Sequence, residues 1–218
     1  MGELLLQLLP ELIGLLITPG AVIGCILLLH SRRPIPNAAA FGAAFVLVYA
    51  MIAISALLGG ASDPGATPEE VSHGAGLVVG LLFLAVGCWT ATRKPPPVGS
   101  RPRLLAELES AGPRKAFVIG IALAVINPNL FIMMAAMSSI SSSGSGAGAA
   151  LVATLALLVA ASLDFLIPMG VFVILGERAR TALDRAETWM LAHSRALSLG
   201  VLFGFGALFT VRGVIDLL

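Results

Sequence analysis

Ile126-Asn127-Pro128-Asn129 interrupts an apolar run that extends from Ala116 to Met137. Proline removes a backbone hydrogen-bond donor and frees the carbonyl group one turn earlier, so a membrane helix tolerates it only where protein groups or water satisfy the loose ends. Two carboxamide side chains and a proline therefore stand where the helix should be continuous. We therefore interpret the stretch as a break in a membrane helix that lines a site.

A second interruption of the same kind, Ile17-Thr18-Pro19-Gly20, lies near the start of the chain. The offset from Thr18 to Asn127 is 109 residues, which is half of the 218 residues. Broken helices at corresponding places in two halves are typical of transporters, whereas a single kink would mean little because Pro and Gly are common in membrane helices. The residues that we expect to meet near the bilayer midplane and to bind a polar group are Thr18, Pro19, Asn127, Pro128 and Asn129.

The composition is that of a membrane protein. Apolar residues make up 58% of the chain and charged residues 11%, against roughly 45–50% and about 25% in soluble domains. The mean hydropathy is +0.99. We expect membrane lipids among the partners of this chain, and no nucleic acid.

Six stretches are long and apolar enough to cross a bilayer core of about 30 Å, which takes about 20 residues of helix. They are Leu4 to Leu29, Ala38 to Leu58, Ala75 to Thr92, Ala116 to Ser138, Ala149 to Leu175 and Ser198 to Leu217. The amino terminus has no basic segment and carries Glu3, so we interpret the first stretch as a retained span and not as a cleaved signal peptide.

Basic residues alternate along the connections between these spans. Twelve of the thirteen Lys and Arg residues follow the first, third and fifth spans, whereas the second connection is acidic and the fourth is a neutral Ser/Gly run. Because basic loops stay in the cytoplasm, both termini are predicted to lie outside.

Three spans in each half require the second half to enter the membrane in the opposite orientation. We therefore predict an all-α polytopic membrane protein with two inverted three-helix repeats, residues 1–94 and 115–218, joined by a cytoplasmic Pro-rich linker at 95–114. Small residues spaced four apart, Gly76 and Gly80 in the third span and Gly200 and Gly204 in the sixth, support close helix packing. Segment 177–196 fits an amphipathic helix on the inner leaflet or, equally, a solvated connector.

Asp164 is an ionisable residue inside the fifth span. A carboxylate there costs about 2.5–3.5 kcal/mol on insertion scales, so its side chain should face a cavity or a partner. One interpretation is that Asp164 takes up and releases a proton during transport. The other is that it is a buried hydrogen-bonding group that fixes helix packing.

Glu11 and Arg212 form a second candidate unit. Counting 1.5 Å per residue places both side chains in the outer part of their spans at similar depths. Pairing would offset the cost of removing each charge from water. The pair would serve as a structural ion pair or as a gate.

Enzymatic alternatives have little support. Cys25 and Cys88 show no metal-ligand spacing and no Cys-x-x-Cys motif, so a membrane thiol oxidoreductase is the weakest hypothesis. His30 and His193 lie at cytoplasmic ends of spans and share no evident site with another ligand. We predict no enzyme activity, no cofactor and no metal site.

The stretch Ser31-Arg32-Arg33-Pro34-Ile35-Pro36-Asn37-Ala38-Ala39-Ala40-Phe41 resembles, with one residue fewer between Arg32 and Pro34, the S-R-x-x-P-x-x-N-x-x-A-F signature of the glycolipid and peptidoglycolipid addressing (GAP) proteins, which belong to the lysine exporter (LysE) superfamily. Ala116-Phe117-Val118-Ile119-Gly120 followed by Asn127-Pro128 resembles the pattern of that family in the second half, and Ile17-Thr18-Pro19 resembles its first-half proline motif. One position departs from the family: Asn129 stands where a lysine is usual.

This resemblance implies six helices in two inverted repeats and export of a lipid, glycolipid or lipid-linked envelope precursor across the bacterial cytoplasmic membrane. Arg32 and Arg33 would contact lipid phosphates, although the topology alone also explains two arginines there. Export of a small polar solute, as in other branches of the superfamily, and a scaffold role in a lipid-export machine are the alternatives. The resemblance leaves a homo-oligomer open.

Overall fold

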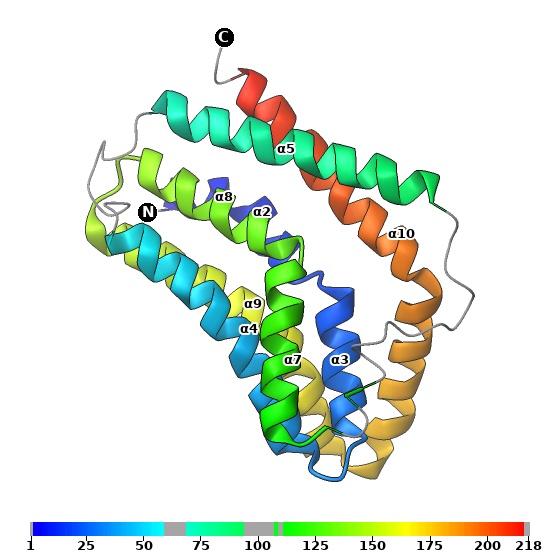
Figure 1. Ribbon diagram of the computed structural model, residues 1–218. Coiled ribbons are helices and arrows are strands. Elements are labelled where there is room, and N and C mark those ends of the chain that lie inside the picture. The colour runs from blue at the N-terminus through cyan, green and yellow to red at the C-terminus, as the bar shows by residue number, and fades with distance from the viewer. Residues whose placement is uncertain (1, 59–68, 94–106, 109–110, 216–218) are drawn as a thin grey trace.

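The computed structural model describes residues 2–58, 69–93, 107–108 and 111–215, and these contain helices and no strand. In chain order the helices are α1 (Gly2–Gln7), α2 (Leu9–Leu15), α3 (Pro19–Leu29), α4 (Pro34–Ala56), α5 (Glu69–Thr92), α7 (Pro113–Ile126), α8 (Asn129–Ser142), α9 (Ala147–Leu175) and α10 (Glu177–Ile215) (Figure 1). The predicted linker 95–114 lies largely outside the described residues.

Four helical stretches are long and apolar enough to cross a membrane: Leu9–Leu29, Pro34–Ala56, Ala147–Leu175 and Arg178–Ile215. The pair α7 and α8, bent by 63°, makes a fifth if it is counted as one span. The described apolar part of α5, Leu77–Thr92, is shorter. The all-helical fold is therefore confirmed, whereas six spans in two inverted repeats remain a prediction.

The core joins the two halves of the chain through aromatic side chains of α4 and α9. Phe165 of α9 packs against Phe41 and Phe45 of α4, with ring centroids 5.8 and 5.1 Å away. Phe41 also packs against two glycines. A Cβ on Gly24 of α3 would lie 2.7 Å from the Phe41 ring, and a Cβ on Gly120 of α7 would lie 2.8 Å from the Phe41 backbone oxygen. Phe41, the last residue of the motif in the first half, is thus a central packing residue.

Helix α5 runs along the end of α10 across one side of the molecule (Figure 1). Glycines let the two backbones approach: a Cβ on Gly80 would lie 2.5 Å from the backbone nitrogen of Thr210, and one on Gly213 would lie 2.8 Å from the Cβ of Leu77. Gly200 and Gly204, which the sequence pattern singles out, have nothing within 4 Å of such an atom. The close approach on α10 therefore uses other glycines than those predicted.

Helix α10 is continuous over 39 residues and includes both segment 177–196 and the described part of the sixth predicted span, up to Ile215. The expected boundary near Ser198 is absent because residues 177–199 contain no Pro or Gly to end the helix. Arg195 fixes this part of α10 to the end of α5, donating to the carbonyl oxygens of Ala91 at 2.9 Å and Arg93 at 3.0 Å. These bonds satisfy carbonyl groups that a helix end leaves without partners.

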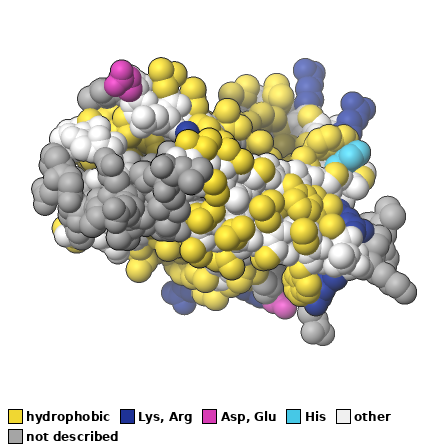
Figure 2. Space-filling model, turned by 90° about the horizontal axis from the view of Figure 1, so that it is seen from above, with side chains coloured by type: hydrophobic (Ala, Val, Ile, Leu, Met, Phe, Trp, Pro, Cys, Tyr) yellow, Lys and Arg dark blue, Asp and Glu magenta, His cyan; other side chains and the backbone are white. Residues whose placement is uncertain are grey.

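Hydrophobic side chains cover much of the described surface. Figure 2 shows them across the middle of one face, with several Lys and Arg side chains toward its right-hand end. Large apolar residues are exposed on most helices, among them Ile54, Val118, Leu166 and Ile174. A surface of this kind is expected where lipid tails replace water.

Candidate functional site

The first predicted helix break is present. Helix α2 ends at Leu15 and α3 begins at Pro19, with Thr18 between them at φ −117° and ψ 79°, outside the helical region. Pro19 occupies the first position of α3, where its missing N–H would have had no helical partner in any case. The carbonyl oxygen of Leu15, which Pro19 cannot bond, accepts a hydrogen bond from the Thr18 hydroxyl at 3.3 Å.

The second predicted break is present as well. Helix α7 ends at Ile126, Asn127 is extended at φ −76° and ψ 132°, and α8 begins at Asn129. The side-chain oxygen of Asn127 accepts a hydrogen bond from the backbone N–H of Asn129 at 3.0 Å. Asn127 thus satisfies a donor at the start of α8 in the manner of a capping residue.

Asn129 joins the two breaks directly. Its side-chain nitrogen donates to the Thr18 hydroxyl at 2.5 Å and to the carbonyl oxygen of Gly14 at 3.2 Å. Both Asn129 and Thr18 are buried. Two segments more than one hundred residues apart therefore satisfy each other's loose polar groups at one point.

A cavity of about 230 Å³ lies at this junction. Both breaks line it, together with Phe45 of α4, and Ser198 and Val201 of α10. Its rim includes Ile17 and Ile126, which are 40% and 68% exposed and apolar. The cavity therefore combines amide and hydroxyl groups inside with apolar groups at the surface.

Asp164 lies on α9 next to this junction, and its side chain interacts with that of Thr18. It is buried at 6% exposure and does not belong to the cavity lining, whereas Thr18 does. The carboxylate is also near the side chains of Cys25 and Tyr49. Asp164 thus lies next to the first helix break and interacts with it through the hydroxyl group of Thr18.

Tyr49 belongs to this region and was missed in the sequence analysis. Its hydroxyl is buried and has no hydrogen-bond partner among the described residues. The available signal was composition, because Tyr49 is the one tyrosine of the chain and lies in an otherwise apolar span. A buried hydroxyl without a hydrogen-bond partner costs about 1–3 kcal/mol, so Tyr49 is a candidate member of the site.

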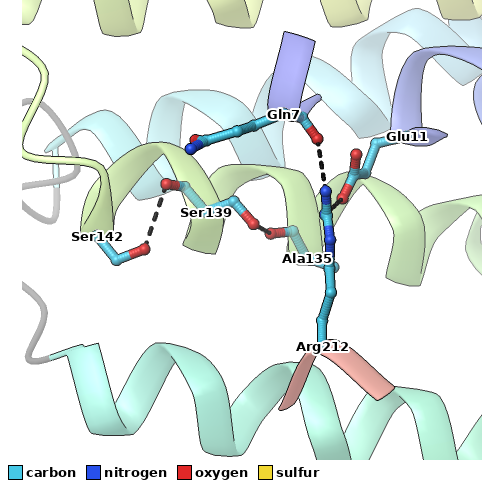
Figure 3. A network of polar contacts seen from close by, with 6 residues as sticks. All are labelled: Gln7, Glu11, Ala135, Ser139, Ser142 and Arg212. Carbon is cyan, nitrogen blue, oxygen red and sulfur yellow. Dashed lines mark hydrogen bonds and ion pairs between the residues drawn. The ribbon is translucent and has the colours of Figure 1, made fainter. Parts of the chain in front are cut away.

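The predicted pair of Glu11 and Arg212 forms between α2 and α10 (Figure 3). Arg212 Nη1 lies 3.0 Å from Glu11 Oε1, and Nη2 donates to the carbonyl oxygen of Gln7 at 3.0 Å. Glu11 is fully buried, and its second oxygen has no partner among the described residues. Nearby, Ser139 and Ser142 bond to carbonyl oxygens of their own helix, α8.

Arg32 and Arg33 are exposed in the turn between α3 and α4, away from the cavity. Their neighbours Ser31 and Asn37 are buried. The side-chain nitrogen of Asn37 donates to the Ser31 hydroxyl at 2.7 Å and to the carbonyl oxygen of Ala111 at 2.9 Å. These motif residues therefore connect the first turn to the segment that precedes α7.

The two cysteines are not paired with each other: Cys25 is buried in α3 and Cys88 is exposed on α5. The thiol of Cys25 contacts the carbonyl oxygen of Phe165 at 3.9 Å. Nothing in this arrangement supports a dithiol relay between them.

A family model described as "Sap, sulfolipid-1-addressing protein" matches residues 9–215. The matched range contains every residue that we expected at the cavity, at the ion pair and in the basic turn. No curated protein and no solved structure matches the chain.

Proposed function

Because the chain belongs to the sulfolipid-1-addressing protein family, we propose that it is a transporter that moves an amphiphilic envelope lipid outward across the bacterial cytoplasmic membrane. Family membership agrees with the resemblance to addressing proteins and supports a role in lipid addressing. The observation that carries the proposal is the cavity at which the two helix breaks meet. Discontinuous helices of this kind form the substrate site in many secondary transporters.

The chemistry of the cavity favours an amphiphile. The side-chain amide of Asn127 and the hydroxyl of Ser198 line the cavity beside the Thr18–Asn129 hydrogen bond, and the N-terminal ends of α3 and α8, with their partial positive charge, lie at the same place. An anionic headgroup such as a sulfate or phosphate ester suits these donors. The apolar rim at Ile17 and Ile126 lets lipid tails remain outside while the headgroup enters.

Two inverted repeats remain part of the proposal, and the packing supports them. Helix α5, the last helix of the first half, packs on α10, the last helix of the second half. The contact of α5 with α8 corresponds to that of α10 with α3, and the contact of α4 with α7 corresponds to that of α9 with α2. A two-fold relation between the halves predicts this set of pairs.

Proton coupling through Asp164 is the proposed source of energy. The carboxylate interacts with Thr18, whose hydroxyl is held by Asn129 at the cavity. A change in the charge of Asp164 would therefore alter the hydrogen bonds that close the two breaks. Glu11 and Arg212 would act as a gate on the side where α2 meets α10, because opening that side must separate them.

Reconstituted vesicles test the transport site. We expect Thr18→Val to slow the movement of a fluorescent sulfated glycolipid between leaflets at least about tenfold, since the substitution keeps the shape of the side chain but removes the hydroxyl, a loss worth about 1–3 kcal/mol at a buried position. Thr154→Val is the matched control, because Thr154 is buried on α9 and bonds within its own helix at 2.8 Å. Equal rates for Thr18→Val and wild type would refute the site assignment.

Asp164→Asn tests the coupling in the same vesicles. We expect the variant to lose the dependence of transport on a pH gradient while it keeps gradient-independent exchange. A small-solute exporter, which the modest cavity volume also accommodates, would accumulate an amino acid or cation and leave the lipid in place. A scaffold would move neither substrate and would co-purify with a stable partner.

A further inference from the structure

His30, Asp184 and Glu187 form a cluster at the opposite end of α3 from the cavity. His30 is the capping residue that follows the last residue of α3, Leu29, and the two carboxylates lie three residues apart on α10. One ligand atom from each residue lies within 4.8 Å of the other two. We propose that this cluster binds a divalent transition-metal ion, and that the ion joins the cytoplasmic end of α3 to α10.

The distance between the His30 and Asp184 ligand atoms fits two ligands of one ion. His30 Nε2 and Asp184 Oδ1 lie 3.1 Å apart. Ligands that each lie about 2.0–2.2 Å from one metal are roughly 3.0–3.4 Å apart when they occupy neighbouring positions. The same His30 nitrogen is buried and makes no hydrogen bond to any described residue, so its alignment toward the carboxylate is not that of an ordinary donor.

The ligand set selects the kind of ion. One imidazole and two carboxylates suit Zn²⁺, Mn²⁺ or Fe²⁺, because imidazole is a poor ligand for Mg²⁺ and Ca²⁺. The two negative charges balance those of a dication. Asp184 is 61% exposed, so water can fill the remaining coordination positions.

A bound ion would affect the cavity because it would connect two of the helices that line it. Pro19 and Gly20 begin α3 at the cavity, and Ser198 and Val201 belong to α10. The ion would hold the other end of α3 against α10 and so restrict how far the cavity opens on that side. This consequence is separate from the identity of the transported substrate.

Zinc titration of the untagged, chelator-treated protein in detergent tests the site. We expect one Zn²⁺ to bind per chain, a Co²⁺-substituted sample to show visible absorption, and Zn²⁺ to raise the thermal unfolding midpoint. Asp184→Asn, at an exposed position, should weaken binding at least about tenfold and abolish the rise in the midpoint, since even the loss of an indirect support costs 10–100-fold.

His193→Gln and Glu107→Gln are matched controls, because they remove an exposed imidazole and an exposed carboxylate outside the cluster. Both should bind Zn²⁺ as wild type does. If Asp184→Asn kept wild-type affinity, or if wild type showed no saturable binding, His30 and Asp184 would be only an ion pair and the proposal would be wrong. The titration measures metal binding and not transport, so the absence of metal binding would not contradict the proposed transport function.

Discussion

Asn129 explains how the two helix breaks are held together. A lysine, usual at this place in proteins that the chain resembles, would bring a fixed charge to the junction. The neutral amide instead donates two hydrogen bonds, to Thr18 and to Gly14, and leaves the junction without a cation of its own. A ligand in the cavity would therefore meet hydrogen-bonding groups and helix ends instead of a fixed charge, and Asp164 is left without a lysine partner at that position.

Glu11 lies in the interior and has Arg212 as its one ion partner among the described residues, so we predict that Arg212→Met destabilises the protein. Truncating one partner of a fully buried pair costs about 3–5 kcal/mol, and since Arg212 is 39% exposed we expect roughly 2 kcal/mol. The readout is a lower thermal unfolding midpoint in detergent. Glu11→Gln combined with Arg212→Met should recover most of this loss, because no buried charge remains unpaired.

The two arginines of the basic turn serve as controls for this prediction. Arg32→Met and Arg33→Met change exposed side chains and should leave the midpoint within the range of ordinary surface substitutions, about 0.5 kcal/mol. An Arg212→Met protein as stable as these controls would show that the buried carboxylate is compensated by other groups.

At the level of elements, prolines interrupt the two helices, and polar side chains form hydrogen bonds with the backbone groups at the interruptions. Pro19 and Pro128 interrupt the backbone ladder. The Thr18 hydroxyl then bonds the carbonyl oxygen that Pro19 releases, the Asn127 side chain accepts from the first N–H of α8, and Asn129 ties the two breaks together. A break made only by proline would leave unpaired carbonyl groups facing lipid. The polar residues therefore belong to the fold as well as to the cavity.

The packing of α5 on α10 leads to a prediction for glycine. Gly80→Ala should lower the free energy of unfolding by about 1–3 kcal/mol, since the new methyl group would meet the backbone of α10 at 2.5 Å and the helices would have to separate. The measurement is the thermal midpoint of the purified protein.

Gly204→Ala is the matched control because the same methyl group meets nothing within 4 Å. It should leave stability unchanged or raise it by up to about 1 kcal/mol, the difference in helix propensity between the two residues. If Gly80→Ala and Gly204→Ala behaved alike, the close approach of α5 and α10 would not contribute to stability.

For the whole molecule, the number of spans depends on whether α5 crosses the membrane. We predict that it does, because the basic residues before α4 and before α7 then lie on the same side. In a variant with Cys25→Ser and Cys88→Ser, a new cysteine at Arg32 or Arg114 should react with an impermeant maleimide only after the cells are permeabilised. A new cysteine at Ser145, in the connection before α9, should react in intact cells.

The cysteine-free parent controls for background labelling. If Arg114→Cys reacted in intact cells while Arg32→Cys did not, the chain would cross the membrane an odd number of times between them. Helix α5 would then not be a span, and the inverted repeat would be wrong.

The sequence by itself determined the helical class, the membrane environment, both helix breaks and the pairing of Glu11 with Arg212. Each of these follows from local chemistry or from depth: proline ends a helix wherever it lies, apolar runs require lipid, and two opposite charges at one depth in an apolar medium attract each other.

Only the tertiary structure decided which side chains meet across the fold. It brought Asn129 to Thr18, placed Tyr49 near Asp164, selected Gly213 instead of Gly204 for close packing, and put His30 beside Asp184. These contacts depend on the rotation of each helix about its axis and on crossing points between distant segments. Both are set by the packing of many side chains at once, so no single stretch of the sequence contains them.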